Sequence, residues 1–126
     1  MLIATSRADD MSELKNLLRE TEWELIGVSD LEHAAAALAA AKLPILLFDR
    51  DSAGAGWPAA IKQLIETRRS ACVVLLSNVC DQYLWDEVVQ HGGFDVLARP
   101  FRKERVLSTL TFAAMHCRTP WPKTAN

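Results

Sequence analysis

Three polar residues that could act together on a phosphoryl group each follow an apolar stretch of the sequence. Asp49 follows residues 45–48, Ser77 follows residues 74–76, and Arg99 follows another short apolar run. A carboxylate can serve as a nucleophile, a hydroxyl can donate to a phosphoryl oxygen, and a guanidinium can balance negative charge. These residue types suit a site that forms or holds a phosphoryl group on Asp49.

Two continuous apolar runs predict the strands that would position these residues. Residues 45–48 and 72–76 show no polar alternation, which is typical of strands buried on both faces of a parallel sheet. Reacting groups collect beyond the carboxyl ends of such strands. We therefore expect Asp49, Ser77 and Arg99 to share one crevice.

The rest of the chain alternates between predicted strands and predicted helices. Further strands are predicted at residues 2–5, 23–28 and 94–98, helices at residues 11–20, 31–41, 58–65, 81–91 and 106–114, and a flexible loop at residues 52–56. We expect Asp9 or Asp10 to cap the first helix and Ser29-Asp30 to cap the second. The strict alternation implies an α/β fold in which helices cover both faces of a parallel sheet.

Length and composition favour one domain. The chain has 126 residues, of which 50% are hydrophobic, and its formal net charge is −2. We take residues 1–118 as the domain and residues 119–126, with Trp121 between two prolines, as a tail. Lys and Arg are scattered, which disfavours nucleic acid as a partner.

The sequence also indicates the compartment. It has neither a basic leader followed by an apolar segment nor an apolar run of membrane-spanning length, so we expect a cytoplasmic protein without membrane contact. Its cysteines, Cys72, Cys80 and Cys117, are odd in number, and we expect no disulfide framework.

Three motifs taken together resemble the response-regulator receiver family. Residues 45–49 are similar to the strand that bears the phosphoacceptor, and residues 74–77 to the strand that ends in the Ser/Thr switch residue. Residues 92–101, Gly-Gly-Phe-Asp-Val-Leu-Ala-Arg-Pro-Phe, resemble the family signature Gly-Ala-x-Asp-Tyr-Leu-x-Lys-Pro-Phe. The resemblance implies a flavodoxin-like (βα)5 fold with a doubly wound, five-stranded parallel sheet in the strand order 2-1-3-4-5.

The same resemblance implies roles for the three polar residues. Asp49 is the candidate phosphoacceptor, Ser77 is the switch hydroxyl, and Arg99 is the partner of the phosphate or of Asp49. It also implies Mg²⁺ as the cofactor.

The sequence departs from the receiver pattern at several positions. The family usually closes its first strand with two acidic residues that hold magnesium, and it has a lysine, an aromatic switch residue and a proline after the phosphoacceptor loop. The residues at these positions are Thr5-Ser6 or Ser6-Arg7 for the acidic pair, Arg99 for the lysine, Val96 for the aromatic residue and Ala53 for the proline. Arg is not an equivalent of Lys in a compact phosphoryl site.

The loss of the acidic pair leaves a weak magnesium site at best. Asp49 and Asp51 are the candidate ligands, since Mg²⁺ prefers carboxylate and other oxygen ligands. Asp9 or Asp10 could reach the site from the start of the first helix, although their more usual role is to place negative charge at a helix N-terminus.

Two functions remain open. The first is a phosphorylatable switch in two-component signalling, in which a partner sensor histidine kinase or phosphotransfer protein modifies Asp49. The alternative is a phosphorylation-independent pseudo-receiver that binds a partner, with Asp49 held by Arg99 in a permanent salt bridge. A small-molecule-binding flavodoxin-like domain is a third reading, but residues 52–56 lack the ordered glycine pattern of phosphate-binding loops. We do not expect an enzyme with independent turnover.

Family resemblance also implies a surface for contact with partners. We expect a stand-alone receiver that passes its signal to a downstream protein or to a second copy of itself as a homodimer. The candidate face combines the fourth helix, the fifth strand and the fifth helix of the predicted order. Its charged residues are Asp86, Glu87, Arg102, Lys103 and Arg105.

Overall fold

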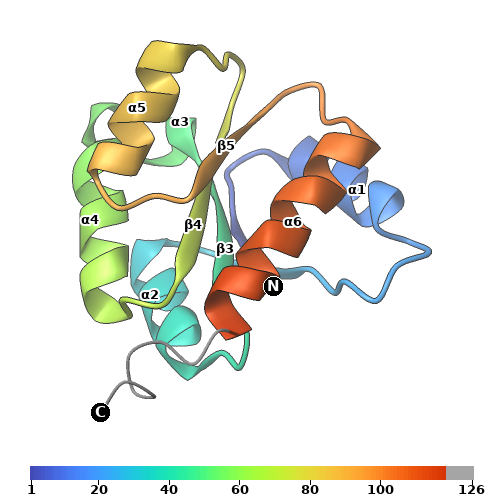
Figure 1. Ribbon diagram of the computed structural model, residues 1–126, viewed down its shortest axis with the longest axis horizontal. Helices are drawn as coiled ribbons and strands as arrows, with labels where there is room; N and C mark the ends of the chain where they lie inside the picture. Colours follow the sequence, from blue (N-terminus) through green and yellow to red (C-terminus); the bar gives the residue numbers. More distant parts are fainter. Residues whose placement is uncertain (119–126) are drawn as a thin grey trace.

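The computed structural model describes residues 1–118 and contains one five-stranded parallel sheet (Figure 1). Its order, β2-β1-β3-β4-β5, confirms the predicted topology. The strands are β1 Leu2–Ala4, β2 Ile26–Val28, β3 Ile45–Asp49, β4 Cys72–Ser77 and β5 Asp95–Ala98. The predicted tail with Trp121 lies outside the described residues.

Helices cover both faces of this sheet. They are α1 Ala8–Leu17, α2 Leu31–Ala40, the short α3 Arg50–Ala53, α4 Trp57–Thr67, α5 Gln82–Gln90 and α6 Lys103–Arg118. Figure 1 shows α2, α4 and α5 on one side of the sheet and α1 and α6 on the other. Within residues 1–118, no helix is both long enough and apolar enough to cross a membrane.

The continuous apolar run of β3 serves two hydrophobic cores. Leu46 and Phe48 pack in the core beneath α2, α4 and α5, whereas Ile45 and Leu47 pack in the core beneath α1 and α6. Side chains alternate between the two faces of a strand, so a strand covered on both faces needs apolar residues at successive positions. The predicted central position of β3 is therefore confirmed.

The start of the first helix differs from the prediction. Neither Asp9 nor Asp10 is the N-cap, because α1 begins at Ala8 after Arg7, and Arg7 makes no side-chain cap. Asp10 instead lies inside the first turn and is buried, with its carboxylate bonded to other parts of the fold. The helix also ends at Leu17 rather than near Glu20.

The segment predicted as a flexible loop is mostly helical. Arg50–Ala53 forms α3, and Gly54–Gly56 forms a short 3-10 helix, η1. The reason is a cap that we had not predicted: the Asp49 carboxylate accepts a hydrogen bond from the backbone N–H of Asp51. Gly54, at φ 57°, then allows the left-handed turn that ends α3. The cap of α2 by Asp30 is as predicted.

Candidate functional site

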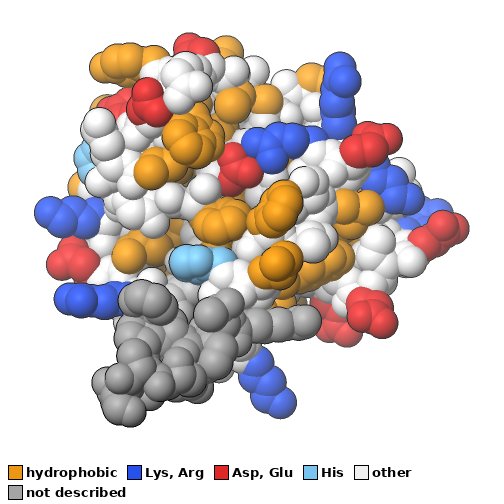
Figure 2. Space-filling view, in the orientation of Figure 1, with side chains coloured by type: hydrophobic (Ala, Val, Ile, Leu, Met, Phe, Trp, Pro, Cys, Tyr) orange, Lys and Arg blue, Asp and Glu red, His pale blue; other side chains and the backbone are white. Residues whose placement is uncertain are grey.

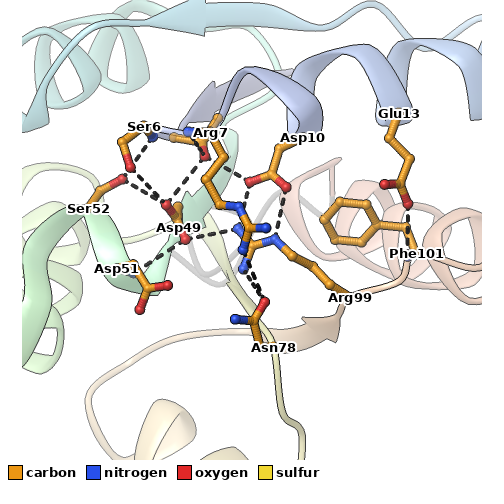
Figure 3. Close-up of polar contacts among 11 residues, drawn as sticks. Ser6, Arg7, Asp10, Glu13, Asp49, Asp51, Ser52, Asn78, Arg99 and Phe101 are labelled. Atoms are coloured by element: carbon orange, nitrogen blue, oxygen red, sulfur yellow. Dashed lines mark hydrogen bonds and ion pairs between the residues drawn. The ribbon is translucent and has the colours of Figure 1, made fainter.

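Asp49 and Arg99 meet at the carboxyl edge of the sheet. In the strand pairing, Asp49 lies opposite Leu76, and Ser77 lies opposite Ala98, so Arg99 extends beyond the last paired row. Arg99 Nη2 lies 2.9 Å from Asp49 Oδ1 (Figure 3). The structure therefore brings together two of the three residues that the sequence placed in one crevice.

A second carboxylate, from α1, holds the same guanidinium. Arg99 Nε donates to Asp10 Oδ1 at 2.8 Å, and Nη2 donates to Asp10 Oδ2 at 2.6 Å. This two-pronged pairing matches the planar fork of a guanidinium. The pKa of Arg99 is raised by the hydrogen bond to Asp10 and by its contacts with Asp49, against the effect of burial. Arg99 is thus a permanent cation held between two buried acids.

The third nitrogen of Arg99 has a neutral partner. Arg99 Nη1 donates to Asn78 Oδ1 at 3.3 Å, and Arg7 Nη1 donates to the same oxygen at 3.1 Å. Asn78 thus links two arginines that lie far apart in the sequence, as Figure 3 shows. With this contact, every nitrogen of the Arg99 guanidinium has a protein acceptor.

Both oxygens of Asp49 also have several donors. Oδ1 accepts from Arg99 and from the Asp51 N–H, at 3.3 Å. Oδ2 accepts from the hydroxyl of Ser52 at 3.1 Å and faces the hydroxyls of Thr5 and Ser6 at 3.3 and 3.4 Å.

The hydroxyl of Thr5 lies within hydrogen-bond distance of both Asp10 and Asp49. Its single hydroxyl hydrogen has a shorter path to Asp10 Oδ2, 2.8 Å away, than to Asp49. Together with the other donors, these contacts leave Asp49 0% exposed. Burial by itself would raise the pKa of Asp49, but hydrogen bonds from Arg99 and the Asp51 N–H, with the charge of Arg99, hold it below the ordinary value of 3.8.

Ser77 is buried, but within residues 1–118 its hydroxyl forms a hydrogen bond with neither Asp49 nor Arg99. Its Oγ accepts from the backbone N–H of Val79 at 3.2 Å, which is an ordinary turn contact. Its backbone carbonyl accepts from the N–H of Arg99 at 2.8 Å. The switch role of the Ser77 hydroxyl stays a prediction.

The residues of this site do not fit a magnesium ion. Mg²⁺ requires oxygen atoms that are free to point at it in near-octahedral geometry. The oxygens of Asp49 and Asp10 are engaged by donors, and a guanidinium lies between the two carboxylates. Asp51, the other predicted ligand, is exposed, and residues 1–118 contain no group of three His, Cys, Asp or Glu that could hold a metal.

Sequence reasoning missed the role of Asp10. One signal could have shown it: Asp10, Leu14 and Leu18 recur every fourth residue, and all three are buried. A carboxylate on the buried stripe of a helix needs a cationic or hydrogen-bonding partner. No comparable signal indicated that Asn78 would accept hydrogen bonds from Arg7 and Arg99.

Comparisons with known proteins support the predicted fold. No protein-family model matches the chain, and no curated protein matches it. Among solved structures, the signal receiver domain of an HD domain-containing protein from Pseudomonas fluorescens Pf-5 is similar, with a TM-score of 0.79 and 19% identity over 94% of this chain and 88% of that one.

Two further solved structures agree. A two-component response regulator from Clostridium difficile gives a TM-score of 0.76 and 18% identity, covering 94% of this chain and 97% of that one. The beryllofluoride-activated NtrC4 receiver domain dimer gives a TM-score of 0.78 and 18% identity, covering 92% of this chain and 96% of that one. The chain therefore has the flavodoxin-like fold of receiver domains, as its motifs predicted.

Proposed function

We propose that this protein is a receiver-fold signalling module that acts through protein contact and does not depend on phosphorylation of Asp49. The observation that carries the proposal is the state of Asp49. This carboxylate is fully buried, both of its oxygens accept hydrogen bonds, and it shares Arg99 with Asp10. Of the functions that the sequence left open, the pseudo-receiver fits this arrangement best.

The argument rests on what a phosphoryl transfer would require. One oxygen of Asp49 would have to attack phosphorus in line with the leaving group, and so would have to leave its donors. Separating Asp49 from Arg99 leaves a buried carboxylate without its cationic partner, which costs about 3–5 kcal/mol. With a cost of that size, phosphorylation would be slower by a factor of about 10²–10⁴.

One observation favours the phosphorylatable switch as a second candidate. The hydroxyls of Thr5, Ser6 and Ser52 and the N–H of Asp51 converge on Asp49, and the same donors could face the oxygens of a phosphoryl group. In that case a histidine kinase or phosphotransfer protein would be the phosphodonor. This reading needs Arg99 to move away from Asp49.

The proposed contact surface is the face formed by α5, β5 and α6. Asp86, Arg102 and Lys103 are exposed there, and Tyr83 and Phe112 expose 78% and 60% of their surface. Figure 2 shows apolar side chains gathered on this side of the molecule with charged groups among them. Exposed aromatic residues beside charged ones are typical of protein interfaces.

Part of this face is fixed by an internal ion pair. Arg105 donates from two nitrogens to the Asp95 carboxylate, each at 3.0 Å, and Thr109 donates to the same group at 3.0 Å. These contacts hold the start of α6 against β5. A downstream protein, or a second copy of this chain, would meet a rigid surface here.

The test is a phosphodonor titration followed by two-dimensional NMR. Addition of magnesium and beryllofluoride, or of acetyl phosphate, should leave the amides of Asp49, Ser77 and Arg99 unshifted in the wild-type protein. Asp49→Asn serves as the control for shifts that do not arise at the phosphoacceptor. Shifts at these amides that are absent from Asp49→Asn would overturn the proposal in favour of the phosphorylatable switch.

A further inference from the structure

Two cysteines far apart in the sequence lie in contact at the opposite end of the sheet from Asp49. Cys72 begins β4, Cys117 lies in the last turn of α6, and their Sγ atoms are 3.4 Å apart. Both are free thiols. Figure 1 shows the end of α6 beside the start of β4. A pair of adjacent thiols on two different elements can be oxidised to a disulfide if their geometry permits it.

The two thiols differ in access and in acidity. Cys72 is only 1% exposed, whereas Cys117 is partly exposed. The hydrogen bond between Cys117 and Cys72 and the positive charge of Arg68 lower the pKa of Cys117. The contact with Cys117, followed by burial, raises the pKa of Cys72. Cys117 is therefore the thiol that an oxidant reaches first, and as a thiolate it is the better nucleophile.

We infer that Cys72 and Cys117 form a reversible intramolecular disulfide on exposure to a hydroperoxide, with Cys117 as the attacking thiol and Cys72 as the resolving thiol. This inference is independent of the proposed function, because it rests on the sulfur contact and not on the Asp49 site.

The chemistry proceeds in two balanced steps. The Cys117 thiolate attacks one peroxide oxygen, the O–O bond breaks, and the departing oxygen takes a proton to become water or an alcohol. Cys117 is then a sulfenic acid. The Cys72 sulfur attacks the Cys117 sulfur, expels hydroxide and gives up its own proton, so that water leaves as the S–S bond forms. Two thiols lose two electrons in all, and the hydroperoxide gains them.

The positions of the two residues make the second step feasible. A disulfide bond is about 2.05 Å long, so the sulfurs must approach by roughly 1.4 Å. Cys117 is the residue before the last of α6, where a helix yields more easily than in its interior. Cys72 stays in place because it pairs with Ile45 of β3, and β4 lies inside the sheet between β3 and β5.

The disulfide would link the end of α6 covalently to the start of β4. At present the thiols make weak contacts: Cys117 Sγ lies 3.4 Å from the Ser70 carbonyl oxygen, and Cys72 Sγ lies 3.6 Å from that of Ala113. A covalent bond would close a large loop between β4 and α6, which restricts the unfolded chain and raises stability.

The experiment uses the full chain with Cys80→Ser, because Cys80 is exposed and could link two molecules. After treatment with hydrogen peroxide and tryptic digestion without reductant, we expect residues 70–102 to be linked to residues 106–118, each with one cysteine in this variant. Dithiothreitol should release the link. The oxidised protein should melt about 5 °C or more above the reduced one.

Two controls test whether the cross-link requires the native fold and Cys117. Protein unfolded in guanidinium should cross-link at least about tenfold more slowly, because it lacks the native proximity of the thiols. Cys117→Ser with Cys80→Ser should show neither the link nor the change in melting temperature. Oxidation of Cys117 to the sulfinic acid while Cys72 remains a thiol would overturn the inference, as would equal cross-linking of native and unfolded protein.

Discussion

Asp10 and Arg99, separated by 89 residues, form a two-pronged ion pair whose bonds are 2.8 and 2.6 Å long. The side chain of Asp10 is 3% exposed and that of Arg99 is 9% exposed. The pair joins α1 to the segment that follows β5 and orients the guanidinium toward Asp49. The site at the carboxyl edge of the sheet thus contains a cation that the chain itself supplies.

Removal of the charge of Asp10 should destabilise the fold. Asp10→Asn keeps the shape of the side chain but leaves Arg99 with less negative charge, and we expect a loss of about 3 kcal/mol in the free energy of unfolding. Urea denaturation monitored by tryptophan fluorescence would measure it. The matched control is the exposed neighbour, Asp9→Asn, for which the change should stay within about 0.5 kcal/mol. Equal effects of the two variants would contradict the structural role of Asp10.

The Asp49 carboxylate should make stability depend on pH in acid. Its pKa in the folded protein lies below 3.8, so on acidification the unfolded chain takes up this proton first. The stabilisation from ionised Asp49 is therefore present above the unfolded pKa and is lost as the pH falls through the folded pKa. Asp49→Asn should show a shallower loss of stability across this range, measured by urea denaturation at several pH values. Parallel curves for the two proteins would contradict this prediction.

Introduction of an acidic pair should create affinity for magnesium at this site. Thr5→Asp with Ser6→Asp, combined with Arg99→Lys, replaces two hydroxyl donors by carboxylates and the forked cation by a smaller one. We expect Mg²⁺ in the millimolar range to shift the amides near Asp49 in this variant, with the wild-type spectrum unchanged. Arg99→Lys alone is the control for a loosened site. Wild-type shifts as large as those of the variant would show that Arg99 does not exclude the ion.

Arg68 should stabilise the end of α2. Its Nη1 donates to the carbonyls of Leu38 and Ala39, at 3.0 and 3.2 Å, and to that of Ala41. These carbonyls close a helix whose last turn has no basic residue of its own. Arg68→Ala should lower the free energy of unfolding by about 2 kcal/mol. Arg69→Ala, an exposed neighbour, should have little effect.

The fold could be predicted from the sequence because its signals are local. The apolar run before Asp49 indicates a strand covered on both faces, and the order of elements then restricts the topology. α3 was missed, because its N-cap is Asp49, to which the sequence assigned a chemical role. A side chain at a strand end can serve both purposes, and composition does not distinguish them.

The site could be predicted only in part, because its partners come from distant elements. The pairing of Asp49 with Arg99 follows from the ends of β3 and β5, which lie on either side of β4 at one edge of the sheet, whereas the Asp10 contact depends on how α1 rotates over the sheet. The contact between Cys72 and Cys117 depends likewise on where α6 ends. The spacing of Asp10, Leu14 and Leu18 indicates that Asp10 is buried, but no spacing along the chain identifies the partner in either contact.

Glu13 lies one turn after Asp10 on α1 and accepts a hydrogen bond from the backbone N–H of Phe101 at 3.0 Å (Figure 3). Asp10 and Glu13 therefore bind Arg99 and Phe101, the residues on either side of Pro100. A ligand that displaced α1 would therefore also displace the segment around Pro100, which leads into α6. The two helices would then move together. The amide of Phe101, although it lies in a loop, would report that motion through its rate of hydrogen exchange with solvent.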